Sequence, residues 1–121
     1  MTDTQETQNE IAALRELARD FFTKEVAPRY EEFAAEGQPD RALYRRAGEL
    51  GLLCISVPEE YGGGGGSFAH EAAVLWEQGK AGDDALGYSV HSSIVAHYIL
   101  TYGSEEQKQK WLPKMATGEL V

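Results

Sequence analysis

A run of five glycines, Gly62 to Gly66, limits the possible folds of this chain more than any other feature. It follows Val57 and Pro58 in a sequence otherwise patterned for helices. Pro58 has no N–H and restricts Val57 to extended geometry, and each glycine adds an entropic cost to a helix or strand. Regular structure should therefore stop before Val57 and restart after the glycines, with Ser67 as the next N-cap.

Glycine-rich turns also bind phosphate, because bare N–H groups can approach an anion closely. The dinucleotide pattern G-x-G-x-x-G needs a third glycine where Ser67 or Phe68 stands. The P-loop pattern needs a Lys-Ser or Lys-Thr pair after the glycines, and none follows. We therefore favour a flexible or tightly turned connector, residues 57–67, over a phosphate site.

Length and charge exclude several classes of protein. At 121 residues the chain fits one domain, which we place at residues 9–121 behind a loose polar tail at residues 1–8. A net charge of -9 argues against nucleic acid or an anionic membrane as the main partner. The single cysteine, Cys54, excludes an internal disulfide and stands in an apolar run, so we expect a small buried hydrophobe. No secretory pattern stands near the start, and a cytoplasmic location is expected.

Apolar spacing and capping residues predict an all-α chain, an up-and-down bundle of about five or six helices. Capping boxes at 7–10 and 104–107 and a cap at Asp40 mark helix starts, while Gly51 is placed for a left-handed helix end. Pro28 and Pro113 should interrupt or kink their helices. A helix after Ser67 is marked by Phe68, Ala72, Leu75, Trp76 and Gly79 and is predicted to end near residues 80–82.

A stretch without charge, Ala85 to Ser104, is predicted to form the next helix, opened by Asp83 and Asp84. We expect neighbours to cover it on nearly all sides. Its serines and histidines are too many for a lipid-facing span, so no membrane span is expected. An α-helical projection places Leu86, Val90 and Ile94 opposite Tyr88, Val95, Ile99 and Tyr102, with a strip of small side chains between them. Two interpretations stay open, a core helix or the wall of a ligand site.

No self-contained active site can be assembled from the sequence. His70 and Glu71 begin a zinc-helix pattern H-E-x-x-H, but Val74 replaces the second ligand, so no metal site is expected. No G-x-S-x-G elbow is present, and adjacent acid pairs fit caps or solvated faces better than a shared-proton dyad. We therefore assign no catalytic, cofactor-binding or metal-binding residue to this chain.

Five stretches together resemble the N-terminal helical domain of acyl-CoA dehydrogenases. In chain order, they are residues 19–28, 47–52, 57–63, 89–94 and 102–113. The resemblance covers nearly the whole chain. It implies an oxidoreductase of fatty acid metabolism that oxidises a fatty acyl-CoA thioester, with a glutamate base and FAD as hydride acceptor in the full-length enzyme. It also implies that the flavin-contacting middle β domain and the catalytic glutamate lie outside this chain, which should be colourless and inactive alone.

By the same resemblance, the uncharged helix forms one wall of the acyl pocket, at Leu86, Val90, His91 and Ile94. His91 fits least well and would touch only the rim. The expected partners are acyl-CoA and the remaining domains of the enzyme, which is expected to form a homo-oligomer. Leu120 and Val121 resemble the start of a strand, so the chain looks cut. The alternative is a free-standing helical module that binds an acyl group or a protein without catalysis.

Overall fold

The computed structural model describes residues 2–121, with side chains from residue 4 onward. Helices dominate, as predicted, and no strand occurs among these described residues. The α-helices are α1 (Thr2–Asp20), α2 (Tyr30–Glu36), α3 (Arg41–Glu49), α4 (Phe68–Lys80), α5 (Ala96–Tyr102) and α6 (Glu105–Ala116). Two π-helical segments (Phe21–Val26 and Ser89–Val95) and two 3₁₀ turns (Ala27–Arg29 and Glu59–Tyr61) complete the order.

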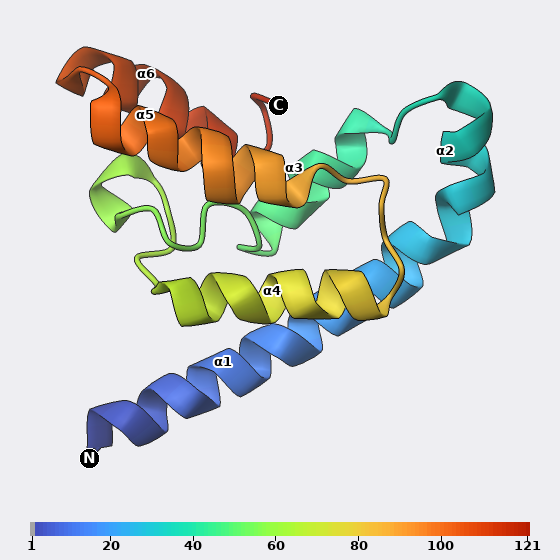
Figure 1. Cartoon of the computed structure of the whole chain (residues 1–121), viewed down its shortest axis with the longest axis horizontal. Coiled ribbons are helices and arrows are strands. Elements are labelled where there is room, and N and C mark those ends of the chain that lie inside the picture. Colours follow the sequence, from blue (N-terminus) through green and yellow to red (C-terminus); the bar gives the residue numbers. More distant parts are fainter. Residues whose placement is uncertain (1) are drawn as a thin grey trace.

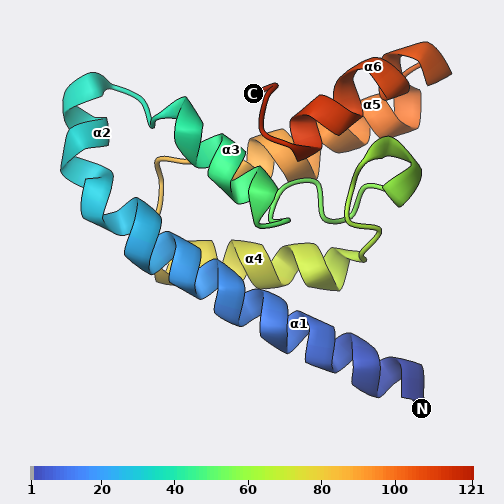
Figure 2. The ribbon, with the colours of Figure 1, turned by 180° about the vertical axis from the view of Figure 1, so that it is seen from behind.

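The helices form two layers with the connector between them. Helices α1 and α4 pack side by side in one layer, and α5 and α6 pack together in the other (Figure 1). The connector and α3 lie between these layers, as the reverse view in Figure 2 also shows. The uncharged helix thus sits above the connector, and this arrangement positions the candidate site.

The apolar interior consists of two clusters. The larger one joins α1, α3 and α4 around buried residues such as Phe21, Phe22 and Val74. The smaller one joins the connector to α5 and α6, with Cys54 and Val57 against Leu112. Cys54 is fully buried, as predicted, and burial raises the pKa of its thiol to about 11. Its packing, and not thiol reactivity, therefore explains its position.

The first helix begins earlier than predicted. Helix α1 starts at Thr2, so the predicted capping box at residues 7–10 lies inside it, and residues 2–8 are helical and not a loose tail. Met1, the remaining residue of that tail, lies outside the described residues. Neither glycine nor proline stands before Pro28 to stop the helix. Pro28 has the predicted effect, because the α-helical pattern has given way to π and 3₁₀ turns by Arg29.

The predicted caps at Asp40, Ser67 and Ser104 and the predicted helix end at Gly51 are confirmed. The Asp40 side chain accepts a hydrogen bond from the Ala42 N–H at 3.0 Å, and Gly51 has the left-handed φ of 75°. Ser67 and Ser104 each form a capping box with the side chain three residues later. Pro113, however, does not interrupt α6, which continues to Ala116. The structure assigns no strand at Leu120 or Val121.

The buried face of α4 is not the set of residues that marks this helix in the sequence. Phe68 and Trp76 are 72% and 61% exposed, whereas Val74 and Glu77 are almost fully buried. Glu77 faces α1, where the guanidinium groups of Arg15 and Arg19 donate to its carboxylate at 3.1 and 3.2 Å. Because these partners come from another helix, apolar spacing within α4 does not reveal that a carboxylate belongs on the inner face.

Glu77→Gln should lower the free energy of unfolding at neutral pH by about 2 kcal/mol, because the carboxylate is buried and doubly paired. The hydrogen bond from Arg19 holds the pKa of Glu77 below its usual 4.5. The carboxylate therefore stabilises the fold above that value, and the stabilisation is lost as pH falls through the lowered pKa.

Urea titrations from pH 7 to pH 3 check this expectation. The difference in free energy of unfolding between wild type and Glu77→Gln should become smaller as the pH falls. Glu6 lies at an exposed position of α1, so Glu6→Gln should have the same free energy of unfolding as wild type at every pH. If this difference in free energy of unfolding does not change with pH, Glu77 is not an ionised, paired carboxylate.

Candidate functional site

The glycine connector is a tight turn and not a phosphate cradle. Every N–H from Gly62 to Gly66 donates to a backbone carbonyl between Cys54 and Glu59, at 2.8 to 3.2 Å. No N–H of this run is left for an anion, and the run has the tightly turned form, one of the two forms expected for this connector. The connector's backbone folds against itself so closely that a Cβ at Gly63 would lie 2.5 Å from the Cβ of Val57.

The uncharged helix begins later than predicted and contains an unexpected segment. Residues 81–87 form a turn in which the Asp83 carboxylate accepts from the N–H of Ala85 at 2.9 Å, so the acids organise the turn instead of opening the helix. The helix starts at Tyr88 and runs as π-helix from Ser89 to Val95. Wider π turns change the angle between successive side chains, so a projection at α-helical spacing misplaces some of them.

One face of this helix is bare within the described chain. The exposed fractions are 55% for Val90, 48% for Ile94, 41% for Val95, 64% for Tyr98 and 79% for Tyr102. The prediction that neighbours cover the helix on nearly all sides is therefore wrong for residues 2–121. Val95 is exposed together with Val90 and Ile94, although the α-helical projection from the sequence placed Val95 on the opposite side of the helix.

The four predicted wall residues separate into two pairs. Val90 and Ile94 are both on the bare face, whereas Leu86 and His91 are buried at 6% and 7% exposure. The His91 ring bonds the Leu120 carbonyl through Nε2 at 2.9 Å and the Ser92 hydroxyl through Nδ1 at 3.0 Å. Burial lowers the pKa of His91. The structure thus brings Val90 and Ile94 together and turns the other two inward.

A shallow groove continues the bare face toward the end of the helix. It encloses about 430 Å³ and is lined by Ser93, Ile94, His97, Tyr98, Thr101 and Tyr102. The rings of Tyr98 and Tyr102 lie 6.0 Å apart. Apolar and hydroxyl-bearing side chains alternate here, and no charged residue lines the groove.

A polar cluster of Ser56, Glu71 and His97 adjoins this groove through His97, which lines it. The Ser56 hydroxyl lies 2.5 Å from the Glu71 carboxylate and 2.7 Å from His97 Nε2. These are residue types of a hydrolase triad, but the carboxylate contacts the serine and not the second ring nitrogen, so the order needed for nucleophilic catalysis is absent. Sequence reasoning missed this cluster, because its members come from the residue before the connector, from α4 and from α5.

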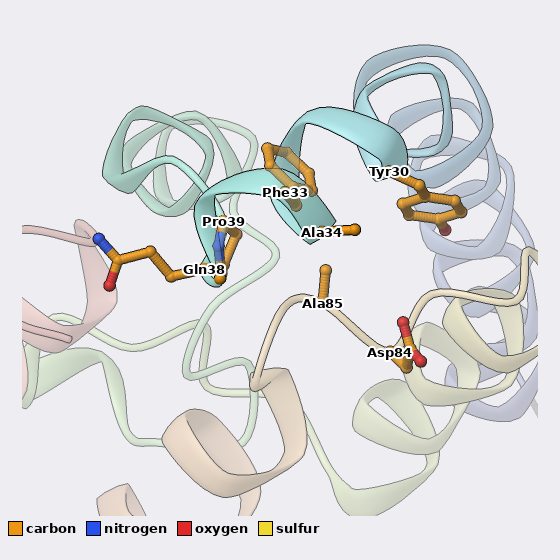
Figure 3. A pocket seen from close by; sticks show the side chains of 8 residues that line it. Tyr30, Phe33, Ala34, Gln38, Pro39, Asp84 and Ala85 are labelled. Carbon is orange, nitrogen blue, oxygen red and sulfur yellow. The ribbon is translucent and has the colours of Figure 1, made fainter.

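A second hollow lies between α2 and the turn at residues 81–87 (Figure 3). It encloses about 300 Å³ and is lined by Tyr30, Phe33, Ala34, Gly37, Gln38, Pro39, Asp84 and Ala85. Asp84 is the one charged side chain in this lining, and no base or nucleophile stands with it. Within residues 2–121, moreover, no three His, Cys, Asp or Glu side chains are grouped to hold a metal ion. We assign no chemistry to this hollow.

Comparison with known proteins decides the family. Residues 8–119 match the family described as "Acyl-CoA dehydrogenase, N-terminal domain". The chain belongs to this acyl-CoA dehydrogenase family. Among curated relatives, it is 42% identical over 108 residues to long-chain specific acyl-CoA dehydrogenase, mitochondrial, of Sus scrofa, covering 88% of the chain and 25% of the relative. It is 40% identical over 114 residues to probable acyl-CoA dehydrogenase YngJ of Bacillus subtilis, covering 93% and 30%.

Solved structures agree with this assignment. The acyl-CoA dehydrogenase of Geobacillus kaustophilus superposes with a TM-score of 0.86 at 42% identity, covering 93% of this chain and 30% of that one. The enzyme of Bacillus anthracis, complexed with FAD, gives a TM-score of 0.79 at 38% identity, covering 92% and 19%. The acyl-CoA dehydrogenase domain seen here therefore spans less than a third of the relatives it matches.

No helix in the described part of this acyl-CoA dehydrogenase domain combines the length and the hydropathy that a membrane crossing requires. The uncharged segment falls short because its π and α parts together end at Tyr102 and carry several serines, histidines and tyrosines.

Proposed function

We propose that this chain is the N-terminal domain of an FAD-dependent enzyme that dehydrogenates a fatty acyl-CoA, and that it supplies one wall of the acyl pocket. The observation that carries the proposal is the exposure of Val90 and Ile94 on a helix with no charged residue from Ala85 to Ser104. A surface left to water normally carries charge, whereas a wall for an alkyl chain excludes it.

Within this wall, the proposed roles differ between the two pairs of residues. Val90 and Ile94 contact the acyl chain, because about half of each residue is exposed on the bare face. Leu86 and His91 support the wall from inside. His91 does so by joining the helix to the carbonyl of Leu120, which fixes the segment after α6 against the helix.

Flavin contacts are not part of the proposed role of this chain. The connector cannot receive the flavin diphosphate, since its glycine N–H groups are all bonded internally. We propose that FAD binds elsewhere in the complete reading frame that encodes this chain, in a cytoplasmic homo-oligomer.

Expression of the 121-residue chain beside the complete reading frame tests this proposal. The chain alone should elute colourless and should not reduce an electron-accepting dye with any acyl-CoA, because one pocket wall cannot position flavin, base and thioester together. The complete product should retain flavin and reduce the dye. If the complete product retains no flavin but binds acyl-CoA, the chain is an acyl-binding module and the dehydrogenase proposal is wrong.

A further inference from the structure

The outer face of α4 carries apolar side chains where a surface helix normally carries charge. Phe68 and Trp76 are mostly exposed, whereas both glutamates of the helix, Glu71 and Glu77, are almost fully buried. Among the charged residues of α4, only Lys80 is exposed, and it is the last residue of the helix. The usual arrangement, polar residues outside and apolar residues inside, is therefore reversed on this helix.

The described neighbours of α4 cover its other sides and leave this face open. Glu77 faces α1, and Glu71 faces the polar cluster that reaches α5. At about 100° per residue, Ala72 points about 100° away from Glu71 and about 140° away from Glu77. No described segment lies in front of α4 in Figure 1, and in the reverse view of Figure 2 α1 crosses in front of it.

The shape of this face favours a helix as the covering element. Phe68, Ala72 and Trp76 follow one another at a spacing of four, so they form one ridge of the helix surface. Two large aromatic side chains flank the small Ala72 at about 6 Å along the axis, which leaves a notch for an aliphatic side chain. This ridge offers no polar side chain to the unpaired N–H and C=O groups of a loop, whereas a helix pairs its own.

The size of the face favours a domain of the same polypeptide over a separate chain. A Phe or Trp side chain buries about 150 to 250 Å² when fully covered. With the exposed fractions of Phe68 and Trp76, the ridge offers on the order of 300 Å², or roughly 600 Å² counted on both surfaces. Stable interfaces between separate chains bury about 1,200 Å² or more, whereas interfaces between domains of one chain begin near about 600 Å². Linked domains need less area, because the linker keeps them at a high effective concentration.

The relatives are long enough to supply such a domain, since the chain spans less than a third of them. We infer that the ridge formed by Phe68, Ala72 and Trp76 docks an apolar α-helix from a part of the complete polypeptide outside residues 1–121. This inference goes beyond the proposed function, because it concerns how the domains attach and not which substrate is oxidised.

The test replaces Trp76 by the photoreactive residue p-benzoylphenylalanine in the product of the complete reading frame. On irradiation, this side chain forms a bond with a group that it touches. Cross-linked peptides should join α4 to a segment outside residues 1–121, and the product should keep the mobility of a single chain on a denaturing gel. The control is the same replacement at Ala13, which is exposed on α1 between the exposed residues Glu10 and Glu16 and should give no cross-link to another segment.

Thiol labelling gives a second measurement that needs only a small change of side chain. In the complete product, a maleimide should react with Ala72→Cys about a hundredfold more slowly than with Ala13→Cys, because the docked helix must open first. Cys54 is buried and is present in both variants, so peptide mass spectrometry identifies the thiol that is labelled. Melting each variant beside wild type shows that the reacting protein is folded.

Two results would overturn the inference. One is a cross-link from position 76 to a second copy, which doubles the mass on the gel, or to residues within 1–121. The other is no cross-link from position 76 together with labelling of Ala72→Cys within about tenfold of Ala13→Cys, because water then covers the ridge.

Oxidation of acyl-CoA by the wild-type product tests the proposed function separately. An active enzyme with an open ridge overturns only the docking inference. A covered ridge in a product that oxidises no acyl-CoA overturns only the dehydrogenase proposal.

Discussion

Ile94→Trp should lower kcat/KM for long acyl-CoAs by about a hundredfold and leave short ones near the wild-type value. Added bulk on the proposed wall displaces the distal methylenes first. Each methylene kept out of an apolar pocket costs about 0.8 kcal/mol, so excluding three or four costs roughly 2.5 to 3 kcal/mol. Val90→Trp should act in the same direction. The structure supports a local effect, because Ile94 is 48% exposed and a larger side chain does not enter the packed interior.

A series of acyl-CoAs of increasing length, measured beside the melting temperature of each variant, checks this expectation. Ala13→Trp adds comparable bulk at an exposed position of α1 and should affect neither quantity. Overpacking a core instead costs about 1 to 3 kcal/mol of stability and acts regardless of substrate length. If kcat/KM falls equally for all chain lengths and the melting temperature is lowered, the pocket assignment is wrong and the helix is part of the packed core.

Several features that depend on neighbouring residues in the sequence were predicted well, although the capping box expected at residues 7–10 and the helix start expected at Asp83 and Asp84 were wrong. The caps at Asp40, Ser67 and Ser104 are hydrogen bonds within two or three residues, so the residue types at those positions suffice to predict them. The 3₁₀ turn at Ala27–Arg29, which contains Pro28, has the same local origin, a missing N–H and a fixed φ. Such interactions place helix ends without knowledge of the tertiary fold.

Features that depend on distant residues were missed. The inward position of Glu77 requires Arg15 and Arg19, which lie 62 and 58 residues away in the sequence. The polar cluster beside the groove joins Ser56 to His97 across 41 residues. Helical periodicity treats any charged residue as outward-facing, so it cannot identify a carboxylate whose partners come from another element.

The bare face of the uncharged helix shows a third kind of limit. Absence of charge from Ala85 to Ser104 favours an environment other than water for this helix. It did not indicate that residues 2–121 would leave Val90 and Ile94 uncovered. The composition of a helix indicates whether its surface is suited to water or to apolar contacts. Whether protein or ligand makes those contacts depends on the three-dimensional structure.

The glycine connector gives the largest expected effect on stability. Gly63→Ala should lower the free energy of unfolding by about 3 kcal/mol, because its Cβ would meet the backbone and side chain of fully buried Val57. To relieve the clash of the added Cβ, the connector would have to move. The connector also contains Tyr61, and the Tyr61 hydroxyl donates a hydrogen bond to Glu105 on α6 at 2.8 Å. Loss of packing between connector and α6 should follow.

Gly79→Ala is the matched control, since it makes the same chemical change with the opposite expected sign. Gly79 lies in α4, and a Cβ there meets nothing within 4 Å. Alanine should therefore raise the free energy of unfolding by about 0.5 to 1 kcal/mol through its higher helix propensity. Denaturant unfolding of both variants measures the contrast. Similar small changes at both positions would mean that residues 57–67 form a loose linker, whereas opposite signs would show that the glycines are needed for close backbone packing and not for flexibility.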